Sequence, residues 1–290
     1  VNGINNSYSN LRLFGQNEKD VNLILYRDRH SWCPYCQKVW LWLEFKKIPY
    51  KVKKINMYCY GKKENWYLEK VNSGKLPAIE LNERIVTESD EIICFLENEY
   101  GILGSSLLSK DISRARVLER EIFRSWCNWL CRKSFSYIDE AFRKNKFKES
   151  ILKLEKILSL SKKGFIDSPI YDSDRLEPGT GDIIFIPYIE RMNASLSYYK
   201  GFNLRNSYPF IDRWLTLLEN FSEYRGTQGD FHTHSHDLPP QMGGCFKEVN
   251  DKQIAFSNLI DVGEGLGNLE FNHELKLEYH AKFALKRVLK

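Results

Sequence analysis

Between residues 21 and 101, this 290-residue chain alternates strand-like and helix-like hydrophobic patterns, and that order leaves few folds open. Residues 21–27 form a continuous apolar run and residues 50–56 alternate apolar with charged side chains, so both are predicted to be strands. Residues 33–46, between them, carry the apolar surface of a helix. The region continues with a helix over 62–71, strands over 76–81 and 84–87, and a helix over 89–101. This order predicts parallel pairing through helical crossovers at first and a hairpin at the end.

The rest of the chain has a different pattern. From about residue 110 to 222 the pattern is helical, and the helices predicted between linkers cover 112–144, 148–160, 182–199 and 209–221. Glycines and prolines interrupt the pattern at 224–246, and a terminal helix is predicted over 273–289. We therefore expect an extended Asn-rich arm (1–20), an α/β domain (21–104), an all-helical domain (105–222) and a C-terminal extension (223–290).

Composition excludes several classes of function. The net charge of +5, from 43 basic and 38 acidic residues, is too small to indicate a nucleic-acid partner. No apolar run approaches the roughly 18 residues that a membrane-spanning helix needs. The seven cysteines are too sparse for a disulfide scaffold, so we expect a reducing compartment. Packing is the expected role of three of them, Cys94, Cys127 and Cys131.

Cys33 and Cys36 enclose a Pro-Tyr dipeptide at the expected junction of the first strand and the first helix. Such a pair is open to three interpretations: a zinc site, a packing role and a reactive thiol. Zinc usually takes four ligands, and no second Cys/His pair lies near in the sequence. Pro34 suits the first turn of a helix, which places Cys33 at the N-terminus, where unpaired N–H groups and the helix dipole favour a thiolate. We therefore favour the third interpretation, in which Cys33 attacks and Cys36, one turn inward, resolves a mixed disulfide.

Two further segments have the chemistry of a ligand site. The Leu76-Pro77 bond is a candidate cis peptide, which would present the Leu76 backbone N–H and C=O to the main chain of a ligand. Glu88 and Ser89 precede a helix whose N-terminus suits a carboxylate, with Ser89 as the N-cap and Glu88 accepting from an ammonium group. Taken singly, the first segment is also a common strand start and the second a common helix cap.

Together, "CPYC", "KLPAIE" and "TESDEIICFLE", at these separations and followed by a helical half, resemble the cysteine-type glutathione transferases of the omega, lambda and dehydroascorbate reductase types. The resemblance covers about residues 21–222. It implies a thioredoxin-like N-terminal domain followed by the all-α glutathione-transferase C-terminal domain. The "CPYCQKVWLWLE" stretch and the extra C-terminal segment look most like the iota class of photosynthetic organisms. With a chain that begins at Val1, this implies a removed targeting sequence and a plastid (chloroplast) location, the alternative being the cytoplasm.

By position, the resemblance implies a glutathione site around Cys33, which matches the catalytic cysteine that forms a mixed disulfide with glutathione. Lys63 matches the lysine that meets the glycyl carboxylate, and the Leu76 backbone matches the partner of the cysteinyl part. Glu88 and Ser89 match the pair that holds the γ-glutamyl end. The full set implied to bind glutathione is Tyr35, Lys63, Leu76, Pro77, Glu88 and Ser89.

The chain departs from the resembled families in three places. Two cysteines stand where the omega type usually has one, and a second cysteine suggests dithiol chemistry, as in glutaredoxins. Residues 223–290 extend beyond an ordinary transferase. In the helical half, "GTGDIIFIPYIERM" resembles the family's capping segment, with Asp182 as its folding aspartate, but Gly179 replaces the usual Ser or Thr.

The extension holds His232, His234 and His236 at alternate positions. On an extended strand all three would face one side, which suits a metal site, a structural or interface role, or contact with a substrate. The sequence assigns no metal, and the three histidines stay candidates for one. Cys245 follows them and has no predicted position.

The sequence therefore predicts a glutathione-dependent thiol transferase or reductase that acts on a small oxidised or disulfide substrate. No nucleic-acid partner and no transmembrane segment is expected. One rival is a non-catalytic subunit that docks through residues 1–20 and 223–290 in a larger, plastid complex, because folds are reused for unrelated functions. Another rival is a binding module for a tetrapyrrole or other hydrophobic cofactor, although no residue specifies such a ligand.

Overall fold

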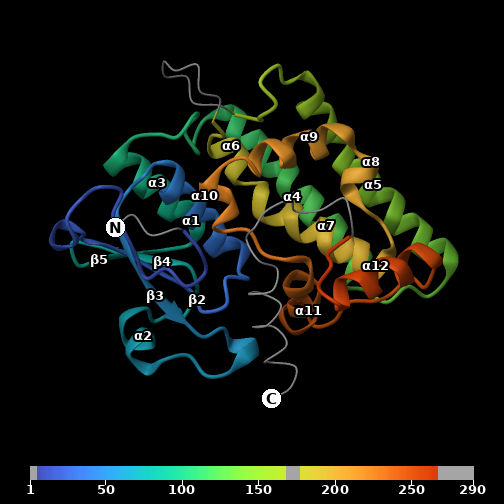
Figure 1. Ribbon diagram of the computed structural model, residues 1–290, viewed down its shortest axis with the longest axis horizontal. Helices are drawn as coiled ribbons and strands as arrows, with labels where there is room; N and C mark the ends of the chain where they lie inside the picture. Colours follow the sequence, from blue (N-terminus) through green and yellow to red (C-terminus); the bar gives the residue numbers. More distant parts are fainter. Residues whose placement is uncertain (1–4, 168–176, 267–290) are drawn as a thin grey trace. The chain divides into compact units, whose positions relative to one another are not determined.

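The computed structural model describes residues 5–167 and 177–266 (Figure 1). The chain divides into two compact units that alternate along the sequence. The first unit comprises residues 1–117, 161–187 and 214–228, and the second comprises residues 118–160, 188–213 and 229–290. The terminal helix predicted over 273–289 lies outside the described residues. In the described ranges, every helix is too short or too polar to cross a membrane.

The first unit is built on a five-stranded sheet with the strand order β1-β3-β2-β4-β5. Its strands are β1 (Leu11–Arg12), β2 (Leu23–Asp28), β3 (Tyr50–Ile55), β4 (Ala78–Leu81) and β5 (Arg84–Thr87). β2 and β3 pair in parallel, and β4 pairs antiparallel with both β2 and β5, so the expected crossover and hairpin are both present. The N-terminal arm is more than an extended segment, because β1 pairs antiparallel with β3 at the sheet edge.

Helices cover both faces of this sheet (Figure 1). α1 (Pro34–Phe45) and α3 (Ser89–Tyr100) pack on one face, and α2 (Asn65–Lys70) packs on the other. Tyr26 of β2 and Ile55 of β3 belong to a buried cluster with Tyr67 of α2. Neighbouring side chains of a strand point to opposite faces, so the fully buried Leu25 lies on the face that α1 and α3 cover.

The start of α3 differs from the expectation in one position. Ser89 is the first helical residue, and Glu88 is the N-cap with a φ of 66°. That left-handed φ is uncommon for a residue other than glycine. In the preceding β4–β5 turn, Asn82 and Glu83 both have positive φ, at 49° and 67°, which matches the twist of a two-residue hairpin.

Asp182 organises the capping segment in the first unit. Its carboxyl oxygens accept four hydrogen bonds, from the backbone N–H groups of Ile166, Asp167 and Gly179 at 2.8, 3.0 and 3.1 Å and from Trp214 Nε1 at 2.8 Å. Gly179 is the N-cap of α6 (Thr180–Ile183). A capping box has two hydrogen bonds, and glycine has no side chain for one of them. The other bond is formed, because the Gly179 N–H donates to the Asp182 carboxyl group.

The remaining helices are α4 (Lys110–Leu130), α5 (Tyr137–Leu160), α7 (Ile186–Lys200), α8 (Leu204–Ser207), α9 (Pro209–Leu218), α10 (Ser222–Arg225), α11 (Phe231–Met242) and α12 (Asp251–Asp261). The unbroken helix predicted over 112–144 is wrong, because α4 ends at Leu130 and α5 begins at Tyr137. Ser136 starts α5 by accepting the Asp139 N–H on its Oγ at 3.2 Å. The interruption expected between residues 144 and 148 is absent, and α5 runs through it.

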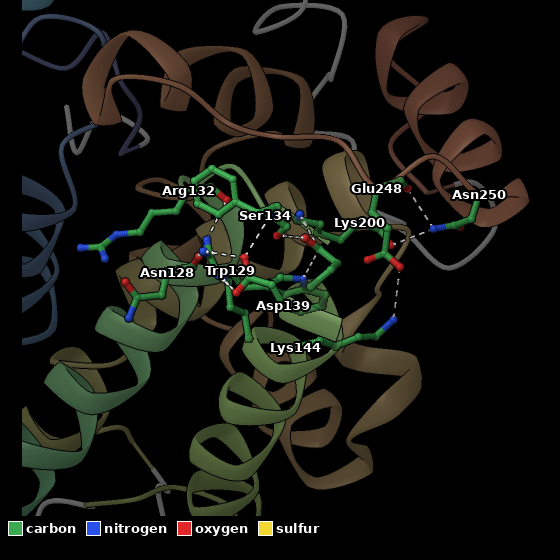
Figure 2. Close-up of polar contacts among 12 residues, drawn as sticks. Asn128, Trp129, Arg132, Ser134, Asp139, Lys144, Lys200, Glu248 and Asn250 are labelled. Atoms are coloured by element: carbon green, nitrogen blue, oxygen red, sulfur yellow. Dashed lines mark hydrogen bonds and ion pairs between the residues drawn. The ribbon is translucent and has the colours of Figure 1, made fainter. Parts of the chain in front are cut away.

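Polar side chains connect helices of the second unit around Lys200, the last residue of α7 (Figure 2). Lys200 Nζ lies 2.7 Å from Glu140 Oε1, and the same oxygen accepts Trp129 Nε1–H at 2.7 Å. Lys144 pairs with Glu248 at 3.8 Å, which attaches the C-terminal extension to α5. The Lys200–Glu140 pair is almost fully buried, so removing one partner would leave a charge without compensation.

The extension forms two helices, α11 and α12, within the second unit. The extended strand considered for the three histidines is therefore not formed. Asp230 caps α11, because its carboxylate accepts the Thr233 N–H at 2.6 Å and the Thr233 hydroxyl at 2.9 Å. Pro239 and Pro240 lie inside this helix, within the 224–246 region where prolines were expected to interrupt the helical pattern.

Candidate functional site

Strand register brings three connecting segments to one end of the sheet. Tyr26, near the end of β2, pairs with Ala78, the first residue of β4, and Ala78 also pairs with Thr87, the last residue of β5. The segment after β2, the segment before β4 and the segment after β5 therefore lie at the same end. These segments carry Cys33, Leu76-Pro77 and Glu88-Ser89.

Cys33 is the N-cap residue of α1. Its backbone is extended, with φ −66° and ψ 116°, and its Sγ accepts the Cys36 backbone N–H at 3.4 Å. Pro34 is the first helical residue, where its missing N–H loses no intrahelical bond. Both cysteines are thiols, with no disulfide between them. The Cys33 sulfur therefore lies at the positive end of the helix dipole.

Cys36 lies one turn further along α1 and is 1% exposed. Burial raises the pKa of its thiol well above the ordinary value, the hydrogen bond and charge of Cys33 and the charge of Asp28 raise it further, and a bond from the Asp28 backbone opposes them. A thiol with a raised pKa stays protonated at neutral pH and is a poor nucleophile.

A buried charged pair at the end of β2 supports the loop that leads to Cys33. Asp28 Oδ2 accepts the Trp32 N–H at 2.6 Å. Arg27 Nη1 donates to the Asp28 carbonyl at 2.8 Å and to Ser31 Oγ at 2.7 Å. Both charged side chains are 0% exposed. The sequence analysis missed this pair, although two adjacent charges at the end of an apolar strand were the available signal.

Aromatic rings surround the same loop. His30 and Trp32 stack with ring centroids 4.4 Å apart, and Tyr60 meets Trp32 edge-on at 4.4 Å. Tyr35, the residue expected beside the catalytic cysteine, is the second residue of α1 and is 37% exposed. Its position lets it contact a molecule that approaches Cys33 from solvent.

Lys63 is a buried cation close to the two thiols. It is 7% exposed, and its Nζ lies 5.0 Å from the ring centroid of Tyr58 and 5.8 Å from that of Tyr67. Burial lowers the pKa of Lys63, and the neighbouring acidic groups, which are the two cysteines when ionised and then Glu64 and Asp28, oppose this shift. The ammonium and the thiols therefore influence one another electrostatically.

The other expected contacts lie at the two remaining segments. The Leu76-Pro77 bond is cis, as the sequence predicted. Ser89 is buried in the first turn of α3, and the Glu88 side chain beside it is exposed. Lys75 Nζ lies 2.7 Å from Glu88 Oε1, so this carboxylate is placed to accept an ammonium group.

The three histidines lie in the second unit, on α11, and do not act as one set. His234 is buried and bonds through Nε2 to Glu190. Burial and the charge of Arg191 lower the pKa of His234, and the Glu190 carboxylate opposes this shift. His232 and His236 group instead with Asp261 of α12.

The remaining cysteines of the second unit are also brought together. The Phe246 N–H donates to the Leu130 carbonyl at 2.9 Å, and this contact places Cys245 beside Cys131. A hydrogen bond between these two thiols lowers the pKa of Cys131 and, with burial, raises that of Cys245. Burial raises the pKa of Cys127 to about 12. Cys127 and Cys245 therefore stay protonated near neutral pH, and Cys131 is the most nucleophilic of the three thiols.

The sheet with its parallel β-α-β start, the cis-proline segment and the cysteine that caps α1 define a thioredoxin-like protein. Residues 32–99 match the family described as glutathione S-transferase, N-terminal domain. The chain is 25% identical over 198 residues, 68% of this chain and 69% of the other, to "Glutathione S-transferase DHAR3, chloroplastic" of Arabidopsis thaliana. It is 27% identical over 207 residues, 68% of this chain and 79% of the other, to "Glutathione S-transferase L1" of the same plant.

Among solved structures, the dehydroascorbate reductase of Chlamydomonas reinhardtii matches with a TM-score of 0.59 at 17% identity, covering 76% of this chain and 98% of that one. The chain therefore resembles glutathione S-transferases and has their fold, with a thioredoxin-like N-terminal sheet followed by a helical domain. The predicted fold class is confirmed, and extra C-terminal residues lie beyond the part that the relatives cover.

Proposed function

We propose that this protein is a glutathione-dependent thiol transferase or reductase in which Cys33 is the attacking residue. The observation that carries the proposal is the Cys33 sulfur at the N-terminus of α1, where it accepts the Cys36 N–H at 3.4 Å. The nearby Lys63 ammonium adds positive charge that favours a thiolate. Relatives named as glutathione S-transferases support the same chemistry.

The proposed reaction exchanges one disulfide for another. The Cys33 thiolate attacks the glutathionyl sulfur of a mixed disulfide R–S–S–G, the S–S bond breaks, and R–S⁻ leaves and takes a proton from water. The thiolate of a second glutathione then attacks the Cys33–S–S–G intermediate, releasing oxidised glutathione and the Cys33 thiolate. The net reaction is R–S–S–G plus glutathione giving R–SH plus oxidised glutathione, so atoms and electrons balance.

Charge complementarity supports the proposed glutathione contacts. Glutathione carries a carboxylate at each end and an ammonium at one end. Ser89, in the first turn of α3, and Lys63 each suit a carboxylate, and Glu88 suits the ammonium. The proposed contact set is Tyr35, Lys63, Leu76, Pro77, Glu88 and Ser89.

The burial of Cys36 indicates that glutathione, not Cys36, resolves the intermediate. We expect Cys36→Ser to keep at least roughly half of the activity, because a buried and protonated thiol adds little to the second step. The measurement is the rate of NADPH oxidation when a glutathionylated peptide is reduced in a glutathione reductase-coupled assay. At pH 7, iodoacetamide should label Cys33 and leave Cys36 unmodified.

Cys94→Ser is the control, since Cys94 is another cysteine within a helix of the first unit, although it is only partly buried. If Cys36→Ser instead lost most of the activity and accumulated the Cys33 mixed disulfide, the dithiol route would replace the proposed one.

An exposed apolar surface favours an assembly role as a second function. Phe135, Tyr137, Ile138 and Phe142 are 90%, 84%, 80% and 60% exposed, at the start of α5. A group of exposed apolar side chains of this kind marks contacts with other proteins. We propose that the chain self-associates or joins a larger complex through this surface, which is compatible with thiol chemistry in the first unit.

We expect the Phe135→Ser, Ile138→Ser double variant to remain folded and to lose association, because both side chains already face solvent. Light scattering after size exclusion would give a mass above the 34.3 kDa of one chain for the native protein and the single-chain mass for the variant. A single-chain mass for both proteins would rule out self-association through this surface.

Membership of the iota class and a plastid location are further parts of the proposal. They draw support from the chloroplastic relative of Arabidopsis thaliana and from the resemblance in "CPYCQKVWLWLE". Imaging of the full gene product fused to a fluorescent protein tests the location, and a cytoplasmic signal would contradict it.

A further inference from the structure

Helical geometry sorts the three histidines of the extension into two groups. Residues four apart lie on the same face of a helix, so His232 and His236 are neighbours on α11. Their ring centroids are 4.3 Å apart. His234 lies between them in the sequence and hydrogen-bonds to Glu190 through Nε2 instead. Two imidazoles on one face of a helix therefore remain available for a shared ligand.

A carboxylate from a second helix completes this group. Asp261 is the last residue of α12, which packs against α11. His236 Nε2 lies 2.8 Å from Asp261 Oδ1. One ligand atom from each of His232, His236 and Asp261 lies within 4.8 Å of the other two. The second Asp261 oxygen accepts the Tyr198 hydroxyl at 3.3 Å, which orients the carboxylate from behind.

The group also contains a polar atom that the protein leaves unsatisfied. His232 Nδ1 is buried and has no hydrogen-bond partner. Buried ring nitrogens are usually paired with protein or water, so an orphaned one calls for an explanation. This observation is independent of the clustering of the three side chains.

We propose that His232, His236 and Asp261 bind one divalent transition-metal ion of the zinc type. Two imidazoles and a carboxylate are a ligand set of zinc sites that leave a fourth position to water. Calcium and magnesium are excluded because they prefer all-oxygen surroundings. The His236–Asp261 hydrogen bond is replaced by metal bonds to the same two side chains.

The ion connects α11 to α12 near the turn where two prolines remove backbone hydrogen bonds from α11. Pro239 has no N–H, so the Ser235 carbonyl lacks its usual helical partner and accepts the Tyr199 hydroxyl at 3.0 Å instead. Pro240 removes a second donor from the same turn. A metal bridge at His232 and His236, one turn earlier, fixes the helix against α12 and so anchors the extension.

The test is zinc binding by the full chain, stripped with a chelator and kept reduced with a phosphine. Competition with a chromophoric chelator should show one zinc ion per chain at this site. The His232→Gln, His236→Gln double variant should lose it. Asp261→Asn should bind zinc at least about tenfold more weakly, because even the substitution of a residue that only hydrogen-bonds to a metal ligand lowers metal affinity by that much. Asp251→Asn, the same change at the other end of α12, is the matched control and should bind like the native chain.

Two additional readouts separate this site from the cysteines. Cobalt(II) bound to nitrogen and oxygen lacks the intense ultraviolet charge-transfer band that thiolate ligands give. Zinc should raise the Tm of the native chain and leave that of the double variant unchanged. If the double variant fails to fold, the zinc affinities of the single variants Asp261→Asn and His236→Gln provide the test. Absence of zinc binding, or a thiolate band that disappears in Cys33→Ser, would overturn the proposal.

Discussion

Replacing Cys33 with serine is expected to lower the rate of glutathione-dependent disulfide reduction by at least about 1,000-fold. A hydroxyl has a far higher pKa than a thiol, so the N–H groups at the start of α1 cannot hold it as a nucleophilic anion. Serine is a good N-cap and can still accept the Cys36 N–H, so α1 should begin as before. The measurements are the initial rate with bis(2-hydroxyethyl) disulfide and the mass of the glutathionyl adduct under limiting glutathione.

Cys59→Ser provides the matched control for this experiment. Cys59 is an exposed cysteine in η2 (Tyr58–Tyr60) of the same unit, and its replacement should leave the rate within about twofold. If Cys33→Ser kept a rate within tenfold of the native chain, some other group would carry the reaction. If it also kept the glutathionyl adduct, mass mapping would identify the responsible thiol.

The sequence predicted the first unit well because its strands and helices have different periods. Residues 50–56 alternate apolar and charged side chains, and β3 occupies Tyr50–Ile55. The end of α4 was not predictable in the same way. Apolar side chains continue at helical spacing through residues 131–136, and the break depends on a local bond, in which Ser136 caps α5 through the Asp139 N–H.

The candidate site was predicted only in part, for a related reason. Motif spacing identified Cys33 and the segments before β4 and after β5, because strand order alone brings them to one end of the sheet. Arg27 and Asp28 look like the polar end of a strand in the sequence, and only the structure shows that both are fully buried. The alternate spacing of the histidines suggested a strand as one arrangement, whereas the cap supplied by Asp230 starts a helix there.

Asp182→Asn is expected to lower the free energy of unfolding by about 3 to 5 kcal/mol, because hydrogen bonds to a charged or buried carboxyl group are worth about 1.5 to 3 kcal/mol each. Each Asp182 oxygen accepts two N–H donors, Ile166 and Trp214 at Oδ1 and Asp167 and Gly179 at Oδ2. Whichever way an asparagine amide turns, its NH₂ group faces two donors. Urea unfolding followed by tryptophan fluorescence gives the loss.

Asp111→Asn is the control, since Asp111 is 89% exposed and its replacement should change stability by less than about 0.5 kcal/mol. A loss below about 1 kcal/mol for Asp182→Asn would mean that the segment around α6 rearranges to satisfy its N–H groups without the carboxyl group.

The pH dependence of this deficit has a definite sign. Burial raises the pKa of Asp182 to about 7, although its four donors act in the opposite direction. An unfolded chain has an aspartate pKa of about 3.9, so between pH 4 and 7 the folded state holds a proton that the unfolded state has released. The contribution of Asp182 to stability therefore decreases as pH rises through that window. The asparagine variant does not titrate, so its deficit should be larger at pH 5 than at pH 8. A deficit that instead increases with pH would show that the four N–H donors outweigh burial and keep Asp182 ionised.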